Sequence, residues 1–188
     1  MFNMIFLVTL VMFIIATGVF GSSSGVCGST KESLVERLLA AKTTSGKTFD
    51  EIAKALGVTN AYAAQLFVNQ AQLKPNTVDK LKAVVPGIDE EDLKLMQRAP
   101  MRSFDPSIMQ EPLIYRLVEA MQHYGEGIKH LVNEKFGDGI MSAIDIFVDM
   151  TEVTGVSGER RIALTLNGKY LPHIEQEAAK NTEVVSLR

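Results

Sequence analysis

The sequence predicts an α+β protein, in which an N-terminal helical bundle precedes a small domain of helix and antiparallel sheet. Between residues 31 and 98, apolar residues recur three or four positions apart, as in helices that bury one face. From about residue 143, apolar residues alternate with smaller or polar ones, which is the period of strands. A proline-punctuated stretch joins the two parts. We therefore expect domains at 31–98 and 99–188, with a loosely attached tail from about residue 173.

The helical part carries the signals of a helix-turn-helix. A first helix follows a possible cap at Ser29 or Thr30, and a second spans Phe49–Leu56. Gly57 can take the left-handed conformation that ends a helix, and a third helix runs from Asn60 to about Asn69. Two more short helices are expected at about 77–85 and 89–97. This arrangement is typical of DNA-binding motifs.

Two functions are compatible with such a motif. A DNA-binding regulator with a small-anion-sensing C-terminal domain would read bases through Asn60, Gln65, Asn69 and Gln70. Residues 60–67, however, contain no Lys or Arg to hold the phosphate backbone, and the formal net charge of the whole chain is -3. We therefore favour a packing or oligomerisation module and predict no nucleic-acid partner.

Acidic residues and cysteine give little sign of metal chemistry. The run Asp89–Asp92 opens a predicted helix, where negative charge suits the positive helix terminus, so we interpret it as a solvated first turn. A single cysteine, Cys27, excludes an intrachain disulfide and a cysteine-based zinc cage.

The first thirty residues combine a hydrophobic run with a linker. Met4–Phe20 is nearly all apolar, and the following residues to Thr30 are rich in Gly and Ser. The run is long enough for a secretory signal and at the lower limit for a membrane anchor, but a dispensable extension is equally compatible. We expect membrane contact only if residues 4–20 are retained, and the sequence does not decide the compartment.

The C-terminal part is expected to contain two helices and a few strands. One helix runs from Pro112 to about His123, Gly125 and Gly127 interrupt it, and a second, 128–136, is capped by Gly137. Strands are expected at 143–153 and 160–166, with a turn at 155–158 between them. Asn167-Gly168 is a strong hairpin signal that would return the chain through 169–171. A sheet this small has open edges, so we expect it to pair with a partner subunit.

Three polar residues in this part are candidates for catalysis. Arg116 and Glu119 lie three positions apart, on one face of a helix, and Ser142 follows a glycine-flanked loop. An arginine between apolar residues must be paired or bind an anion, and its fork fits a planar anion. From the residues alone, an ordinary surface ion pair and a local serine cap remain the simpler interpretations. Ser142 does not lie in a Gly-x-Ser-x-Gly motif, so a hydrolase nucleophile is not expected there.

Several runs in this region resemble the cyanase (cyanate hydratase) family. They are Glu111-Pro112, Tyr115-Arg116-Leu117, Glu119, Tyr124-Gly125-Glu126, Ile128-Lys129 and, most specifically, FGDGIMSAID at residues 136–145. The resemblance extends over roughly residues 31–172. It implies a helix-turn-helix-like N-terminal domain without a regulatory role.

The resemblance also implies an activity and a site. Cyanases combine cyanate with bicarbonate to give carbamate and carbon dioxide, and carbamate then loses ammonia. The catalytic residues would be Arg116, Glu119 and Ser142, with Ala143 and Leu171 lining the substrate pocket. Bicarbonate would be a co-substrate, and no cofactor or metal would be needed. Members assemble as decamers built from dimers, with active sites between subunits, and a cytoplasmic location would follow.

Overall fold

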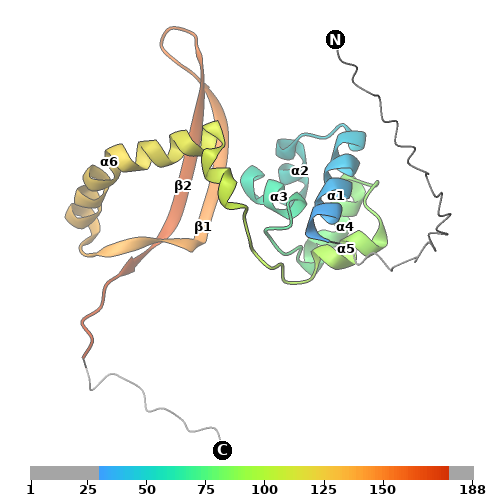
Figure 1. Cartoon of the computed structure of the whole chain (residues 1–188), viewed down its shortest axis with the longest axis horizontal. Coiled ribbons are helices and arrows are strands. Elements are labelled where there is room, and N and C mark those ends of the chain that lie inside the picture. The colour runs from blue at the N-terminus through green and yellow to red at the C-terminus, as the bar shows by residue number, and fades with distance from the viewer. Residues whose placement is uncertain (1–29, 178–188) are drawn as a thin grey trace, which may run out of the picture.

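The structure is a computed structural model that describes residues 30–177, and it confirms the α+β class. Five helices, α1–α5, form a bundle, and an extended segment leads from it to a long helix, α6, and a two-stranded antiparallel sheet (Figure 1). The hydrophobic run at residues 4–20 lies outside the described residues. The predicted domain boundary between residues 98 and 99 stays a prediction.

The bundle helices begin and end at the signals seen in the sequence. Thr30 accepts a hydrogen bond from the Ser33 N–H, and Thr48 forms a reciprocal capping box with Glu51. Gly57 ends the second helix with φ at 75°, a conformation that glycine adopts without strain. The helices are α1 (Lys31–Ser45), α2 (Phe49–Leu56), α3 (Asn60–Phe67), α4 (Pro75–Val84) and α5 (Glu90–Met96).

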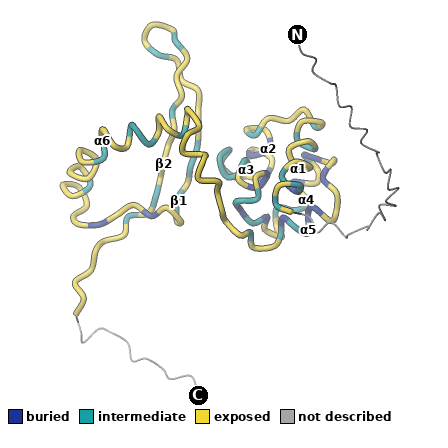
Figure 2. The backbone as a smooth tube through the Cα atoms, in the orientation of Figure 1, coloured by how far each residue is buried: buried dark blue, intermediate teal, exposed yellow. Residues whose placement is uncertain are grey.

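The hydrophobic core of the described residues lies entirely in this bundle (Figure 2). Its largest fully buried side chains come from every helix and from the connections between them. They are Leu38, Ile52, Leu66, Phe67, Leu73, Leu81, Val85, Leu93 and Met96. The helix-turn-helix region is thus a packed body in its own right.

One predicted feature of the bundle is only partly right. Asp89, Glu90 and Glu91 are exposed, as expected of a solvated turn, but Asp92 is only 4% exposed. The Arg37 Nη2 and Nε atoms donate to its two carboxylate oxygens at 2.6 and 2.9 Å. Asp89 caps α5 by accepting from the Asp92 N–H. The carboxylate can be buried because a bidentate arginine from α1 compensates its charge.

The third helix of the bundle faces the sheet. The Asn60 carboxamide donates to the Met150 carbonyl at 2.7 Å and accepts from the Met150 N–H at 3.1 Å, as a neighbouring strand would. The same carboxamide donates to Asp50 at 2.8 Å. Asn60, the first residue of the helix through which a DNA-binding protein would read bases, is therefore occupied in docking the bundle onto β1 (Gly139–Thr154).

The connection to the C-terminal part contains a short 3₁₀ helix, η1 (Pro106–Gln110), and then α6 (Pro112–Phe136). Glu111 caps α6 by accepting from the Ile114 N–H, and Gly137 ends it. The predicted interruption at Gly125 and Gly127 is wrong, because α6 is continuous. Each glycine costs only about 1 kcal/mol in a helix, which the regular turns on either side outweigh.

The sheet consists of β1 and β2 (Arg160–Pro172), joined by a turn at residues 155–158. The predicted turn at Asn167-Gly168 is wrong, because both residues lie inside β2 and pair with Phe147 and Ile146. A turn at Asn167-Gly168 would have ended the pairing of β2 with β1 at that point. Because β2 continues without a turn, it pairs with β1 along nearly the whole of both strands.

The C-terminal part has no hydrophobic core within the single chain (Figure 2). No residue of α6 is buried, and most of its large apolar side chains are exposed, as are many on both strands. Among them are Leu113, Met121, Ile128, Leu131, Ile144, Phe147, Ile162 and Leu164. An apolar surface of this extent marks an interaction site.

Candidate active site

Arg116 and Glu119 form an ion pair near the start of α6. The Arg116 Nη1 atom donates to Glu119 Oε2 at 2.6 Å, as the spacing of three residues predicts. The arginine side chain is 69% exposed and also lies over the Tyr115 ring, 5.6 Å from its centre. The guanidinium therefore keeps most of its donors available to a ligand while one carboxylate orients it.

Ser142 lies at an irregularity near the start of β1. Met141 pairs with Tyr170 and Ile146 with Gly168, so residues 142–145 bulge opposite a single residue of β2, Lys169. Ser142 is 8% exposed. Its Oγ accepts from the Asp145 N–H at 2.9 Å and from the Ile144 N–H at 3.2 Å.

This geometry sets what the hydroxyl can do. An oxygen that accepts two backbone hydrogen bonds still carries its own hydrogen, which is free to donate. The serine is therefore held as an oriented donor. The local cap anticipated from the sequence is present, and it is compatible with a role toward a ligand.

The two predicted pocket residues lie at the end of the sheet that also carries the Ser142 bulge. Ala143 belongs to the bulge and is exposed, and Leu171 is partly exposed and pairs with Ile140. Both are thus within a few residues of Ser142 along the paired strands.

The single chain does not join the two halves of the predicted site. Among residues 30–177, no hydrogen bond or ion pair links Arg116 or Glu119 with Ser142. The ion pair lies on the second turn of α6, whereas the serine follows the loop beyond the other end of that helix (Figure 1).

A charged cluster that sequence reasoning missed holds the loop between α6 and β1. Asp138 pairs with His173 Nδ1 at 3.2 Å and with Lys129 Nζ at 3.3 Å, and its carbonyl accepts from the Tyr170 hydroxyl at 3.1 Å. These contacts keep the pKa of the Asp138 carboxyl below its ordinary value of 3.8, with the His173 hydrogen bond as the main cause and that of Lys129 second. The only sequence signal was the charged residue between Gly137 and Gly139.

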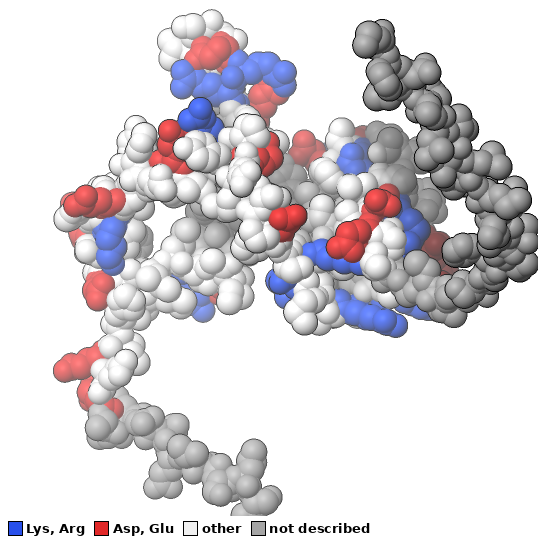
Figure 3. Space-filling model, viewed as in Figure 1, with Lys and Arg blue, Asp and Glu red and all other residues white. Residues whose placement is uncertain are grey.

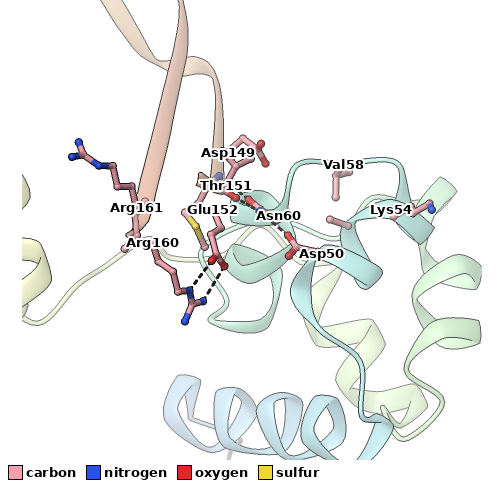
Figure 4. Close-up of a pocket in the computed structure, with 12 residues that line it drawn as sticks. Asp50, Lys54, Val58, Asn60, Asp149, Thr151, Glu152, Arg160 and Arg161 are labelled. Atoms are coloured by element: carbon pink, nitrogen blue, oxygen red, sulfur yellow. Dashed lines mark hydrogen bonds and ion pairs between the residues drawn. The ribbon is translucent and has the colours of Figure 1, made fainter. Parts of the chain in front are cut away.

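A cleft in another part of the described residues has no predicted site residue in its walls. It has a volume of about 880 Å³ and separates α2 and the start of α3 from the hairpin (Figure 4). Its polar walls are largely self-paired: Arg160 makes a bidentate contact with Glu152 at 2.6 and 2.9 Å, and Asn60 bonds to Asp50.

Neither the surface charges nor the arrangement of possible metal ligands points to a further site in the described residues. On the face seen in Figure 3, Lys and Arg side chains lie beside Asp and Glu on both the bundle and the hairpin tip. Within residues 30–177, no group of three or more His, Cys, Asp or Glu side chains is placed to hold a metal ion. None of the helices in that range is long and apolar enough to cross a membrane.

Comparisons with known proteins point to one family. A family model described as the cyanate lyase C-terminal domain matches residues 106–175. Cyanate hydratase of Arabidopsis thaliana is 49% identical over 158 residues, which is 84% of this chain and 94% of that protein. That of Phaeodactylum tricornutum (strain CCAP 1055/1) is 51% identical over 148 residues, 78% of this chain and 77% of that protein.

The solved structures agree. Cyanase from T. urticae matches with a TM-score of 0.66 and 29% identity, covering 74% of this chain and 97% of that chain. None of these relatives is named as a DNA-binding protein, so the comparisons give the regulator hypothesis no support.

Proposed function

The chain belongs to the cyanate hydratase family, and we propose that it decomposes cyanate, with bicarbonate as co-substrate, through a site that neighbouring copies complete. Similarity over most of the length of its relatives is the observation that carries this proposal. In the first step cyanate, bicarbonate and one proton give carbamate and carbon dioxide. Carbamate and a second proton then give ammonia and another carbon dioxide.

The main obstacle to this reaction is the repulsion between two anions. Arg116 supplies compensating charge, because its guanidinium is exposed on the single chain and only one of its edges is engaged by Glu119. In a site sheltered from water by a partner subunit, that charge acts at low dielectric and counts for more than in solvent.

Ser142 orients a substrate by donating its hydroxyl hydrogen to an oxygen or nitrogen. Two backbone N–H groups fix the position of its oxygen, so the donor direction is set before the substrate arrives. Ala143 and Leu171 shape the apolar side of the same pocket.

Glu119 has two possible roles. It either holds Arg116 in place or transfers one of the protons that the reaction consumes. Bicarbonate supplies the nucleophile, so the protein needs only to position the two anions and stabilise the charge as it shifts.

The assembly we propose is a homo-oligomer, a decamer built from dimers. The support for oligomerisation is the exposed apolar surface of α6 and the sheet, together with the separation of Arg116 from Ser142 within one chain. Contact with a second copy both covers that surface and lets an α6 face another subunit's serine loop.

A coupled assay tests the activity. Ammonia release from cyanate is measured with and without added bicarbonate, and again after dialysis against EDTA. We expect release that depends on bicarbonate and is unchanged by EDTA, since the proposed site uses no metal or cofactor. Absence of ammonia under all conditions contradicts the activity, and full activity in isolated monomers contradicts the shared site.

A further inference from the structure

Gly168 lies in the middle of β2, where the sequence pattern had suggested a turn. In β2 its backbone passes directly beneath the bulge of β1. A Cβ atom built at this position would lie 2.4 Å from Met141 Cγ and 2.5 Å from the carbonyl oxygen of Ser142. Real Cβ atoms do not approach other heavy atoms this closely, so something must shift to admit even one methyl group.

The two contacts differ in kind. Met141 is a flexible, partly exposed side chain that can turn away. The Ser142 oxygen belongs to the backbone, which can move only if the bulge itself moves. That bulge is already fixed by the two hydrogen bonds to Ser142 Oγ and by the Lys169–Asp145 ion pair at 3.6 Å.

We propose that Gly168 is a positioning residue for Ser142: the missing side chain lets β2 support the bulge at the one distance that aims the serine hydroxyl at the substrate. The proposal rests on the function given above and names one more residue that this function requires. Asn167-Gly168 is thus a close-approach site in a strand.

The test is Gly168→Ala, compared with Gly87→Ala as the control, a glycine of the bundle outside the surface proposed as the subunit interface. A Cβ at Gly87 would make only ordinary van der Waals contact with Ala41, at 3.6 and 3.8 Å, so the control adds the same methyl group without crowding. We expect Gly168→Ala to assemble normally and to lose about 10- to 100-fold in kcat/KM, as displacements of about 1 Å do in other sites. The control should keep the activity of the unmodified chain.

A second readout needs no turnover. Hydrogen exchange followed by mass spectrometry reports the Ile144 and Asp145 amides, which donate to Ser142 Oγ. We expect faster exchange at these amides in Gly168→Ala and no change in Gly87→Ala. If the unmodified chain releases no ammonia, the proposed function fails. The exchange rates still decide whether Gly168 determines the position of Ser142.

Three results would overturn the inference. They are activity of Gly168→Ala within twofold of the unmodified chain, unchanged exchange at the two amides, and restoration of activity by adding Met141→Ala. The last would mean that crowding of the methionine alone was responsible. If Gly168→Ala chains do not assemble by themselves, activity is measured instead on mixed assemblies in which unmodified chains are the majority. Activity proportional to the unmodified fraction is then expected, and full activity contradicts the proposal.

Discussion

A guanidinium on α6 and a hydroxyl on β1 carry the proposed chemistry, and both are held by their immediate neighbours. Glu119 engages one edge of Arg116, and two backbone amides engage Ser142. Arg116 is exposed on the single chain, whereas Ser142 is only 8% exposed. What the two groups do to a substrate depends on the other subunit that brings them together.

Removing either group should stop turnover while leaving the assembly intact. We expect Ser142→Ala to lower kcat by about 10²–10³-fold, as the loss of a single positioned donor does in other enzymes, and Arg116→Leu to lower it further because a charge is lost. The measurement is bicarbonate-dependent ammonia release, with the size of the assembly as the control. Normal release from either variant refutes that residue's role.

Some single residues were predictable from the sequence, and others were not. Gly57 was, because the apolar spacing of α2 stops at a glycine. Asp92 was not, because its partner Arg37 is 55 positions away and only packing brings them together. Gly168 was misinterpreted because a glycine demanded by a turn and one demanded by a close neighbour look alike in sequence.

The elements depend on local signals to different degrees. Caps and helical spacing predicted every helix of the bundle to within a few residues. The continuity of α6 and the course of β2 escaped prediction, because helix and strand pairing outweigh the weak local preferences of Gly125, Gly127 and Asn167-Gly168.

The capping box at the start of α2 gives a stability prediction. Thr48→Ala removes the side chain that accepts from the Glu51 N–H, so the free energy of unfolding should fall by about 1 kcal/mol. Denaturant unfolding measures this difference. Thr44→Ala, at an exposed position inside α1, is the control and should leave the unfolding midpoint nearly unchanged. A capping contribution is absent if both variants behave alike.

The Asp138 cluster joins α6, the following loop and the end of β2, and it predicts a pH dependence. Folding lowers the pKa of this carboxyl below 3.8, so its stabilising contribution is complete well above that value and is lost as the pH falls through the folded pKa. Asp138→Asn should therefore melt below the unmodified chain at pH 7. The gap should narrow as the pH falls below 3.8 and close only below the folded pKa.

Thermal unfolding of both chains between pH 3 and pH 7 makes this comparison. Because Asp138 lies four positions before Ser142 in the sequence, the variant also reports on the loop that leads to the serine. A gap that is constant over the whole pH range contradicts a charged Asp138 as its cause.

At the scale of the whole molecule, the two parts of the chain differ in how they are stabilised. The bundle buries a complete core, whereas α6 and the sheet expose most of their apolar side chains. The comparisons establish the family for the chain, and the exposed surface is the physical argument for the proposed homo-oligomer. The open edges of a small sheet led to the prediction of a partner subunit, but the sequence did not predict the extent of this surface.

A charge on the apolar face of α6 should disrupt the assembly. Met121 is 53% exposed and borders a shallow apolar groove with Ile114, Leu117 and Val118. Burying such a side chain contributes about 1.5–3 kcal/mol, so Met121→Asp should weaken each subunit contact at least about tenfold. Analytical ultracentrifugation measures the species present. Leu39→Asp, on the bundle, is the control, and equal dissociation of both variants argues against α6 as the interface.

The central claim is that one copy's Arg116 acts together with another copy's Ser142, and subunit complementation tests it most directly. Arg116→Leu and Ser142→Ala chains, each inactive alone, are co-expressed and their mixed assemblies are purified and assayed. If the two residues come from different copies, random mixing should restore up to about a quarter of the sites, since each position is filled independently. Mixed assemblies that stay as inactive as either parent would contradict a site shared between subunits.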